Sequence, residues 1–355
     1  MSESQRDFIV IGQGLAGTTL AWQLHRRGFR VLVIDRERGN SASRIAAGLI
    51  TPVTGKRLAR SWRLEEVYPA AVAFYRWVET QTSDSFFHEQ PSIRLFQDEA
   101  ERDEFHRRAE SILVGLVRAP ETPVNPDWFL APLGGFEMPT AARLDVSRYL
   151  DLSREYFRQR NDYICADIAP EQDLELTSDG VSLPRCGLKS RAVIFCRGFD
   201  PADDLWFGSI RFNAAKGEIL TLRIPELCET RIVHRGVWLA PVGNGIYRAG
   251  STYEWDDLQP TTTTRSRTEI EGRLRQFLRV PFEVIDHRAA VRPVIDAGFP
   301  VLGRHPVYHQ LAYFNGLGSK GSLLAPFFAE QLAACLADGG QVDRVVDVQR
   351  FMGTT

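Results

Sequence analysis

The chain begins with a pattern of apolar runs and glycines that predicts a strand, a tight turn, a helix and a second strand. Four apolar residues at 8–11 lead into Gly12-Gln13-Gly14-Leu15-Ala16-Gly17. A helix-compatible stretch follows at 18–27, and a second apolar run at 31–34 ends on Asp35. Short continuous apolar runs between turn residues are typical of buried parallel strands. We therefore expect a parallel sheet that starts here.

Farther along, helical periodicity and apolar runs alternate near both ends of the chain, whereas strands dominate its middle. We expect further helices at 68–80, 98–116, 145–159 (with Asp145 as N-cap), 269–278 and 323–336. We expect further strands at 93–96, within 163–183, and at 192–196, 218–223, 237–241, 246–249, 289–293 and 311–314.

This order predicts an α/β fold with two domains. A Rossmann-like nucleotide-binding domain is assembled from discontinuous segments, 1–80, 140–205 and 286–355. A substrate domain that carries a mostly antiparallel sheet is inserted between them, from 81–139 and 206–285. Because nicotinamide dehydrogenases usually keep a contiguous nucleotide domain to one side, this arrangement favours a flavoprotein.

Composition narrows the class of protein without identifying its function. Charged residues make up 25% and apolar residues 44% of the 355 residues, as in ordinary soluble globular proteins. The net charge of −2 favours neither nucleic acid nor an anionic membrane as a partner. Residues 1–7 are polar and resemble no secretory signal, and the apolar runs are too short to span a bilayer. We expect a cytoplasmic protein.

The cysteines indicate neither a disulfide framework nor a metal site. They are five in number and widely scattered, with no CxxC pair. A disulfide framework or a zinc site usually has paired, regularly spaced cysteines.

The glycine-rich turn is the motif with the most specific chemistry. Gly12 makes the tight turn, Gly14 lets the backbone approach a pyrophosphate, and Gly17 lets the helix pack closely on the strand. The helix that opens at Leu15 and Ala16 presents free N–H groups to the phosphates. Asp35 stands where its carboxylate can accept hydrogen bonds from ribose hydroxyls. The alternative is a glycine turn that arose by chance, and such a turn would not require the two strands, the helix and Asp35 around it.

Three other stretches also suggest ligand contacts. Residues 41–52 are small enough to let the backbone lie against a large flat ligand. The glycine in Arg197-Gly198 lets the chain pass close to a bound dinucleotide, and 316–321 form a second glycine turn. The basic cluster at 56–63 is either a solvated face or an electropositive mouth for an anionic substrate.

Four blocks of sequence resemble the D-amino-acid oxidase family of FAD enzymes, in particular its glycine oxidase and sarcosine oxidase branch. They are residues 9–17 with Asp35; residues 42–49; Lys216-Gly217-Glu218 with 237–241 and 247–254; and Val291-Arg292-Pro293 with Asp296, Gly298, Pro300, Gly303, 315–321 and 324–326. Together they cover nearly the whole chain.

The resemblance implies an FAD-binding domain with non-covalently held FAD, because Ala289-Ala290 stand where some relatives carry a flavin-linking cysteine. It implies oxidation of the C–N bond of a small carboxylated amine by hydride transfer, imine hydrolysis, and reoxidation by oxygen or another acceptor. The residues expected at FAD are Gly12, Gly14, Leu15, Ala16, Gly17, Asp35, Arg36, Ser43, Ala46, Ala47, Gly48, Leu49, Arg197, Gly198, Arg292, Gly316, Leu317, Gly318, Ser319, Lys320 and Gly321.

The resemblance also implies roles at the substrate. Arg292 matches the arginine that forms a forked pair with the substrate carboxylate, the alternative being a structural arginine. Tyr247 and Tyr253 are either substrate-facing or core aromatics. Arg248 falls near the cation that activates oxygen in sarcosine oxidases, and Lys320 or the following helix N-terminus could stabilise negative charge on the reduced flavin.

The second glycine turn departs from the glycine oxidase pattern, because residues 317–320 lack its aromatic and arginine. The run is closer to the oxidase half of bifunctional enzymes that modify the tRNA wobble uridine, although the chain has no tRNA-binding charge. Oxidation of a 2-hydroxy acid, oxidation of a carboxymethylamino group on tRNA, and a flavoprotein without turnover are the alternatives. The oligomeric state is left open.

Overall fold

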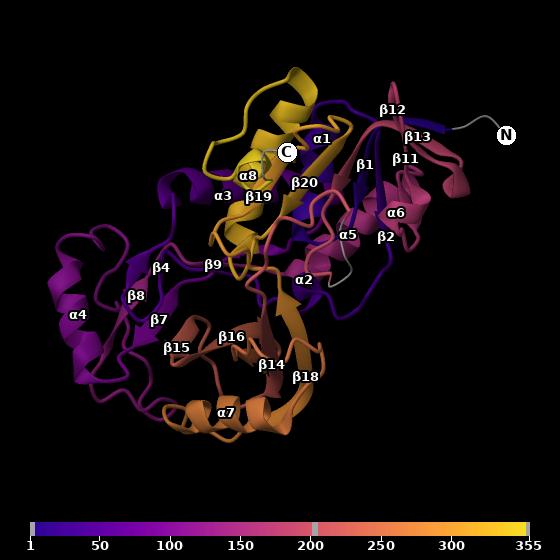
Figure 1. The fold of residues 1–355 in the computed structure, drawn as a ribbon. Coiled ribbons are helices and arrows are strands. Elements are labelled where there is room, and N and C mark those ends of the chain that lie inside the picture. Colours follow the sequence, from indigo (N-terminus) through magenta and orange to yellow (C-terminus); the bar gives the residue numbers. More distant parts are fainter. Residues whose placement is uncertain (1–3, 201–204, 353–355) are drawn as a thin grey trace.

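In the computed structural model, which describes residues 4–200 and 205–352, one large sheet lies in the upper part and a second in the lower part of the view in Figure 1. The first sheet has the order β10-β2-β1-β13-β12-β11, and β20 extends it between β13 and β19. Its strands are β1 (Ser4–Ile11), β2 (Val31–Asp35), β10 (Tyr163–Cys165), β11 (Glu175–Thr177), β12 (Gly180–Leu183), β13 (Leu188–Phe195), β19 (Val301–Arg304) and β20 (Leu311–Asn315). The five strands β10, β2, β1, β13 and β20 run parallel, as predicted.

The second sheet has the order β18-β14-β17-β16-β15-β7-β8, with every pair antiparallel except β15 and β7. Its strands are β7 (Ser92–Leu95), β8 (Gly135–Met138), β14 (Ala215–Arg223), β15 (Ile232–Arg235), β16 (Val237–Gly243), β17 (Ile246–Gly250) and β18 (Glu283–Arg292). A mostly antiparallel second sheet was predicted.

Helices pack beside these sheets and against one another. They are α1 (Leu15–Arg26), α2 (Ala42–Ile45), α3 (Leu64–Thr82), α4 (Glu99–Ala109), α5 (Val146–Gln159), α6 (Pro170–Asp173), α7 (Thr264–Arg275) and α8 (Gly321–Asp338). The short strands β3 (Leu49–Ile50), β9 (Ala142–Leu144) and β6 (Phe87–Glu89) form a three-stranded sheet, and β4 (Val53–Thr54) pairs with β5 (Ala59–Arg60). None of the helices in the described chain is long and apolar enough to cross a membrane.

Local chemistry explains where helices begin and end. Asp145 caps α5, as predicted, because its side chain accepts the N–H of Arg148. The helix expected at 98–116 ends at Ala109 instead. The chain turns there because Leu113 is fully buried in an apolar cluster with Phe136.

The two sheets follow the predicted division of the chain closely, and the domain boundaries themselves stay a prediction. All strands of the first sheet come from the segments assigned to nucleotide binding, and those of the second sheet from the inserted segments. The exception is β18, which runs through the expected boundary at 285/286 and ends on Arg292. This strand therefore carries Arg292 from the second sheet toward the first.

The core is densest where α1, α3, α5 and α8 pack beside the first sheet. Trp22 of α1 is fully buried and donates from Nε1 to Ser153 Oγ of α5 at 2.8 Å. Its ring meets Trp77 of α3 edge-on and Phe157 at a tilt. The second sheet has its own apolar cluster, in which Leu274 of α7 is buried.

We predict that Trp22→Ala lowers the free energy of unfolding by about 3–5 kcal/mol, because truncating a buried aromatic leaves a cavity. Urea denaturation followed by far-UV circular dichroism measures the change. Trp255, which is 56% exposed, provides the control. Trp255→Ala should change stability by less than about 0.5 kcal/mol, and equal losses for both variants would contradict this view of the core.

Candidate functional site

A cavity of about 1020 Å³ lies between the carboxyl ends of the parallel strands and the inner face of the second sheet. Ligands of open α/β sheets bind at such strand ends, and the volume is at the upper end for a small-molecule site. Twenty of the predicted site residues line it: Gly12, Gly14, Leu15, Ala16, Asp35, Arg36, Ser43, Ala46, Ala47, Gly48, Leu49, Arg197, Gly198, Tyr253, Arg292, Leu317, Gly318, Ser319, Lys320 and Gly321. Gly17, Gly316, Tyr247 and Arg248 are not among the lining residues.

The glycine turn between β1 and α1 is held by close backbone contact. Gly12 has φ +106°, and a Cβ there would overlap the carbonyl oxygen of Cys196. A Cβ at Gly17 would overlap the carbonyl oxygen of Gly12. Gly17 therefore shapes the turn from behind, without reaching the cavity.

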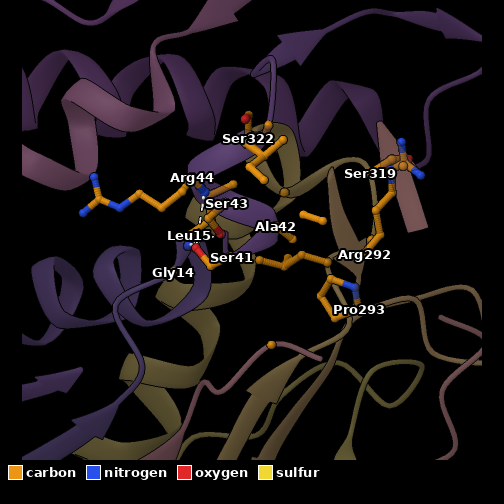
Figure 2. Close-up of a pocket in the computed structure, with 18 of the residues that line it drawn as sticks. Gly14, Leu15, Ser41, Ala42, Ser43, Arg44, Arg292, Pro293, Ser319 and Ser322 are labelled. Atoms are coloured by element: carbon orange, nitrogen blue, oxygen red, sulfur yellow. Dashed lines mark hydrogen bonds between the residues drawn. The ribbon is translucent and has the colours of Figure 1, made fainter. Parts of the chain in front are cut away.

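Ser43 joins α2 to the start of α1. Its Oγ accepts the N–H of Leu15 at 3.0 Å, while the N-cap residue Gly14 provides no side-chain cap (Figure 2). A Cβ at Gly14 would meet the same oxygen at 3.0 Å. The first turn of α1 thus presents backbone N–H groups and a positive dipole end, with no side chain at Gly14 in the way.

Asp35 is fixed at the end of β2 by two backbone donors. Its Oδ2 accepts the N–H of Gln13 and its Oδ1 the N–H of Glu37, each at 2.7 Å. A carboxylate oxygen has two acceptor sites, so both oxygens can still accept a hydroxyl. Beside it, Arg36 and Arg197 share the carboxylate of Asp200, at 3.0 and 2.9 Å.

These residues fit FAD. A fixed carboxylate suits ribose hydroxyls, and a helix N-terminus behind an uncovered glycine suits a pyrophosphate. At the other end of the cavity, Leu317 to Gly321 lead into α8 and present a second helix N-terminus. The donor set and the volume therefore match a dinucleotide with a large second ring system.

Arg292 extends from the end of β18 across the backbone of Gly217, where a Cβ would overlap the guanidinium. Its Nη2 donates to Ser251 Oγ at 2.8 Å and to the carbonyl of Thr252 at 3.2 Å. The guanidinium lies 4.2 Å from the centre of the Tyr253 ring. Burial lowers the pKa of Arg292, and among the described residues no carboxylate pairs with it.

Tyr247 and Arg248 have structural positions. The Tyr247 hydroxyl donates to the carbonyl of Leu227 at 2.6 Å, and burial raises the pKa of Tyr247 to about 12. Its ring lies in the core of the second sheet, which is the structural alternative for this residue. Arg248 donates to the carbonyls of Ala46 (2.7 Å) and Ile45, and burial lowers its pKa to about 10. Arg248 therefore fixes Ile45 and Ala46, which belong to the small-residue segment at 41–52 and line the cavity.

Lys320 is a second cation in the cavity. Its Nζ donates to Thr54 Oγ1 at 3.2 Å, and burial lowers its pKa. No described carboxylate lies within ion-pair distance of it. Arg292 and Lys320 thus both line the cavity, and neither charge is neutralised by a carboxylate of residues 4–200 or 205–352.

The basic cluster lies mostly outside the cavity. Arg60 pairs with Glu65, and Arg63 pairs with Glu66 and Asp343. Lys56 and Arg57 are exposed beside α4. The cluster is therefore largely a solvated, ion-paired face.

Among the cavity-lining residues that sequence reasoning missed are Ser92, Arg94, His234 and Trp238. They lie on β7, β15 and β16, and β7 pairs with two strands that are distant in sequence, β15 and β8. Trp238 alternates with buried residues along its strand, which indicates that it points to the other face. The face itself depends on strand register, which no local signal fixes.

Comparison with known proteins agrees with this geometry. The sequence profile of the family described as FAD dependent oxidoreductase (DAO) matches residues 7–335. An oxidoreductase of Bacillus subtilis (strain 168), YurR, is 22% identical over 92% of this chain and 94% of its own length. The tRNA 5-methylaminomethyl-2-thiouridine biosynthesis bifunctional protein of Marinobacter nauticus is 24% identical over 92% of this chain. The match covers 54% of the length of that relative.

Solved structures share the fold. Glycine oxidase from Geobacillus kaustophilus superposes with a TM-score of 0.79 at 19% identity, covering 98% of this chain and 100% of that one. Iminodiacetate oxidase from Chelativorans sp. BNC1 superposes with a TM-score of 0.75 at 21% identity, covering 97% and 98%.

We predict that Arg248→Met weakens FAD binding at least tenfold, because the carbonyls of Ile45 and Ala46 lose a charged donor worth about 1.5–3 kcal/mol. Fluorescence titration of the apoprotein with FAD measures the dissociation constant. Arg223→Met removes an exposed arginine from neighbouring β14 and should leave it unchanged. Equal affinities in both variants would refute the role assigned to Arg248.

Proposed function

This chain belongs to the FAD dependent oxidoreductase (DAO) family, and we propose that it oxidises the C–N bond of a small amine that carries a carboxylate. The substrate class is a glycine, an N-alkylglycine or a D-amino acid. FAD, when bound, would supply the acceptor for the hydride lost from the carbon beside the nitrogen; water would hydrolyse the imine, and oxygen would take up the two electrons and two protons as hydrogen peroxide.

The position of Arg292 carries this proposal. Its guanidinium faces the cavity without an acidic partner in the described part of the chain, and its planar fork matches the two oxygens of a carboxylate. Because Ser251, Thr252 and the Tyr253 ring fix the fork, little conformational freedom is lost when a carboxylate binds. A carboxylate held there would be oriented before any reaction begins.

The unpaired cations also act on the amine. A protonated amine bound near Arg292 and Lys320 would be repelled by both, so its neutral form is favoured. The neutral amine keeps the nitrogen lone pair that C–N oxidation requires. Ile219 and Trp238 contribute apolar surface to the same cavity and help to exclude water.

The comparisons support the substrate class. The two solved structures of the same fold are, by their names, oxidases of glycine and of iminodiacetate, which are both carboxylated amines. The tRNA-modifying relative supports a second candidate, oxidation of a carboxymethylamino group on tRNA. A 2-hydroxy acid would also place a carboxylate on Arg292.

Anaerobic bleaching of the flavin absorbance distinguishes these functions. The purified holoenzyme is mixed with panels of amino acids, N-alkylglycines, 2-hydroxy acids and total tRNA. Bleaching by carboxylated amines alone supports the proposal. Bleaching by hydroxy acids or by tRNA alone would replace it with the corresponding alternative, and no bleaching by any panel would remove it.

We predict that Arg292→Ala retains FAD and weakens binding of the carboxylated substrate by about 2–5 kcal/mol, because a buried charged partner is lost. Spectral titration of the bound flavin with a substrate analogue such as methoxyacetate measures the affinity. Arg288→Ala, an exposed position on the same strand, is the matched control and should bind normally. Unchanged affinity in Arg292→Ala would show that the arginine is structural.

A further inference from the structure

One arm of the cavity contains buried polar atoms without partners. Ser92 is 1% exposed, and its Oγ has no hydrogen-bond partner among the described residues; His234 Nδ1 is likewise buried and has no partner there. Both residues line the cavity. An unsatisfied buried polar atom costs about 1–3 kcal/mol, so two of them in one place indicate a site whose partner is a ligand.

The strand register places this arm beside the carboxylate fork. Gly250, Trp238 and His234 lie opposite one another on the successive strands β17, β16 and β15. Arg292 bonds to Ser251, the residue next to Gly250. Two strand spacings of about 4.8 Å therefore separate the backbones of His234 and Gly250 by roughly 10 Å, which sets the scale of the distance from His234 to the fork.

This spacing limits the length of the ligand. Hydrogen bonds of about 2.9 Å at each end leave roughly 4 Å between the two bound groups. Three or four covalent bonds of about 1.5 Å span that distance. The arm is thus within reach of a second polar group on the same small molecule.

The charges around the arm favour an anionic group. Arg94, opposite His234, already pairs with the buried carboxylate of Glu101 at 2.5 Å. Burial, with a further contribution from Arg94, lowers the pKa of His234 to about 3, so its ring is neutral and can donate one N–H. The arm therefore offers neutral donors and no negative charge of its own.

Lys320 brings a free positive charge to the same region. It bonds to Thr54, whose neighbour Val53 shares a buried cluster with Met138. Met138 lies opposite Ser92 on the adjacent strand. The cavity wall is therefore continuous from Lys320 to Ser92.

We propose that the arm bounded by Ser92, His234 and Lys320 binds a second carboxylate, so that the substrate is a secondary amine with a carboxylate on each side of the nitrogen. One carboxylate lies on Arg292 and the other in the arm. The inference rests on the proposed function and narrows its substrate class to diacids.

Ligand binding tests the arm separately from turnover. Thiodiacetate has two carboxylates and sulfur in place of the amine, and (methylthio)acetate lacks the second carboxylate. Spectral titration of the flavin in the wild-type holoenzyme should give a dissociation constant at least tenfold lower for thiodiacetate. Equal affinities would overturn the proposal.

Two variants locate the second carboxylate. Ser92→Ala and His234→Phe should each weaken thiodiacetate binding at least fivefold and leave (methylthio)acetate binding unchanged. Ser111→Ala, on the exposed surface, is the control. Ser92→Ala should also leave the melting temperature of the ligand-free protein unchanged or higher, because it removes an unpaired buried hydroxyl. Equal losses for both ligands, or no loss for either, would refute the subsite.

The outcome is separable from that of the proposed function. If thiodiacetate binds as expected and no carboxylated amine bleaches the flavin, the subsite stands and the amine chemistry fails. If N-alkylglycines bleach the flavin and the two thioethers bind equally, the amine chemistry stands and the subsite fails.

Discussion

The close approach of α1 to the end of β1 is the constraint on which the site depends. Gly17 leaves no room for a methyl group against the carbonyl of Gly12, and Gly12 leaves none against Cys196. This contact fixes the direction in which the first N–H groups of α1 point. Ser43 then anchors α2 to the same turn through Leu15. The cofactor-facing backbone is thus set by main-chain packing.

The two sheets are coupled through the same segment. Arg248, on the second sheet, holds the carbonyls of Ile45 and Ala46, which come two and three residues after Ser43. A charged donor in a poorly solvated position is costly unless its hydrogen bonds are made, so the segment and the arginine stabilise each other. These hydrogen bonds therefore fix the position of the second sheet relative to the segment at Ile45 and Ala46.

The sequence alone was sufficient for the fold and predicted most of the residues that line the cavity near β1, α1 and β2, because these features depend on local patterns. The order of apolar runs and glycines predicts β1, α1 and β2, and Asp35 follows from its place after β2. The substrate end depends on pairings between distant strands. Ser92 and His234 become neighbours only because β7 pairs in parallel with β15. Tyr247 and Arg248 carry suitable chemistry, but the alternation of the strand turns Tyr247 into the core and directs Arg248 to backbone carbonyls.

Arg292 and Lys320, which pair with no described carboxylate, make the free energy of unfolding depend on whether an anionic ligand is bound. Without an anion in the cavity, Arg292 and Lys320 are partly desolvated in the folded protein and carry an energetic cost. In the unfolded chain both side chains are in water and this cost is absent. A ligand that binds only the folded protein adds about 2.7 kcal/mol of stability at a hundred times its dissociation constant. Because whole domains are stable by only about 5–15 kcal/mol, substrate supply would govern how long each copy of the enzyme survives proteolysis.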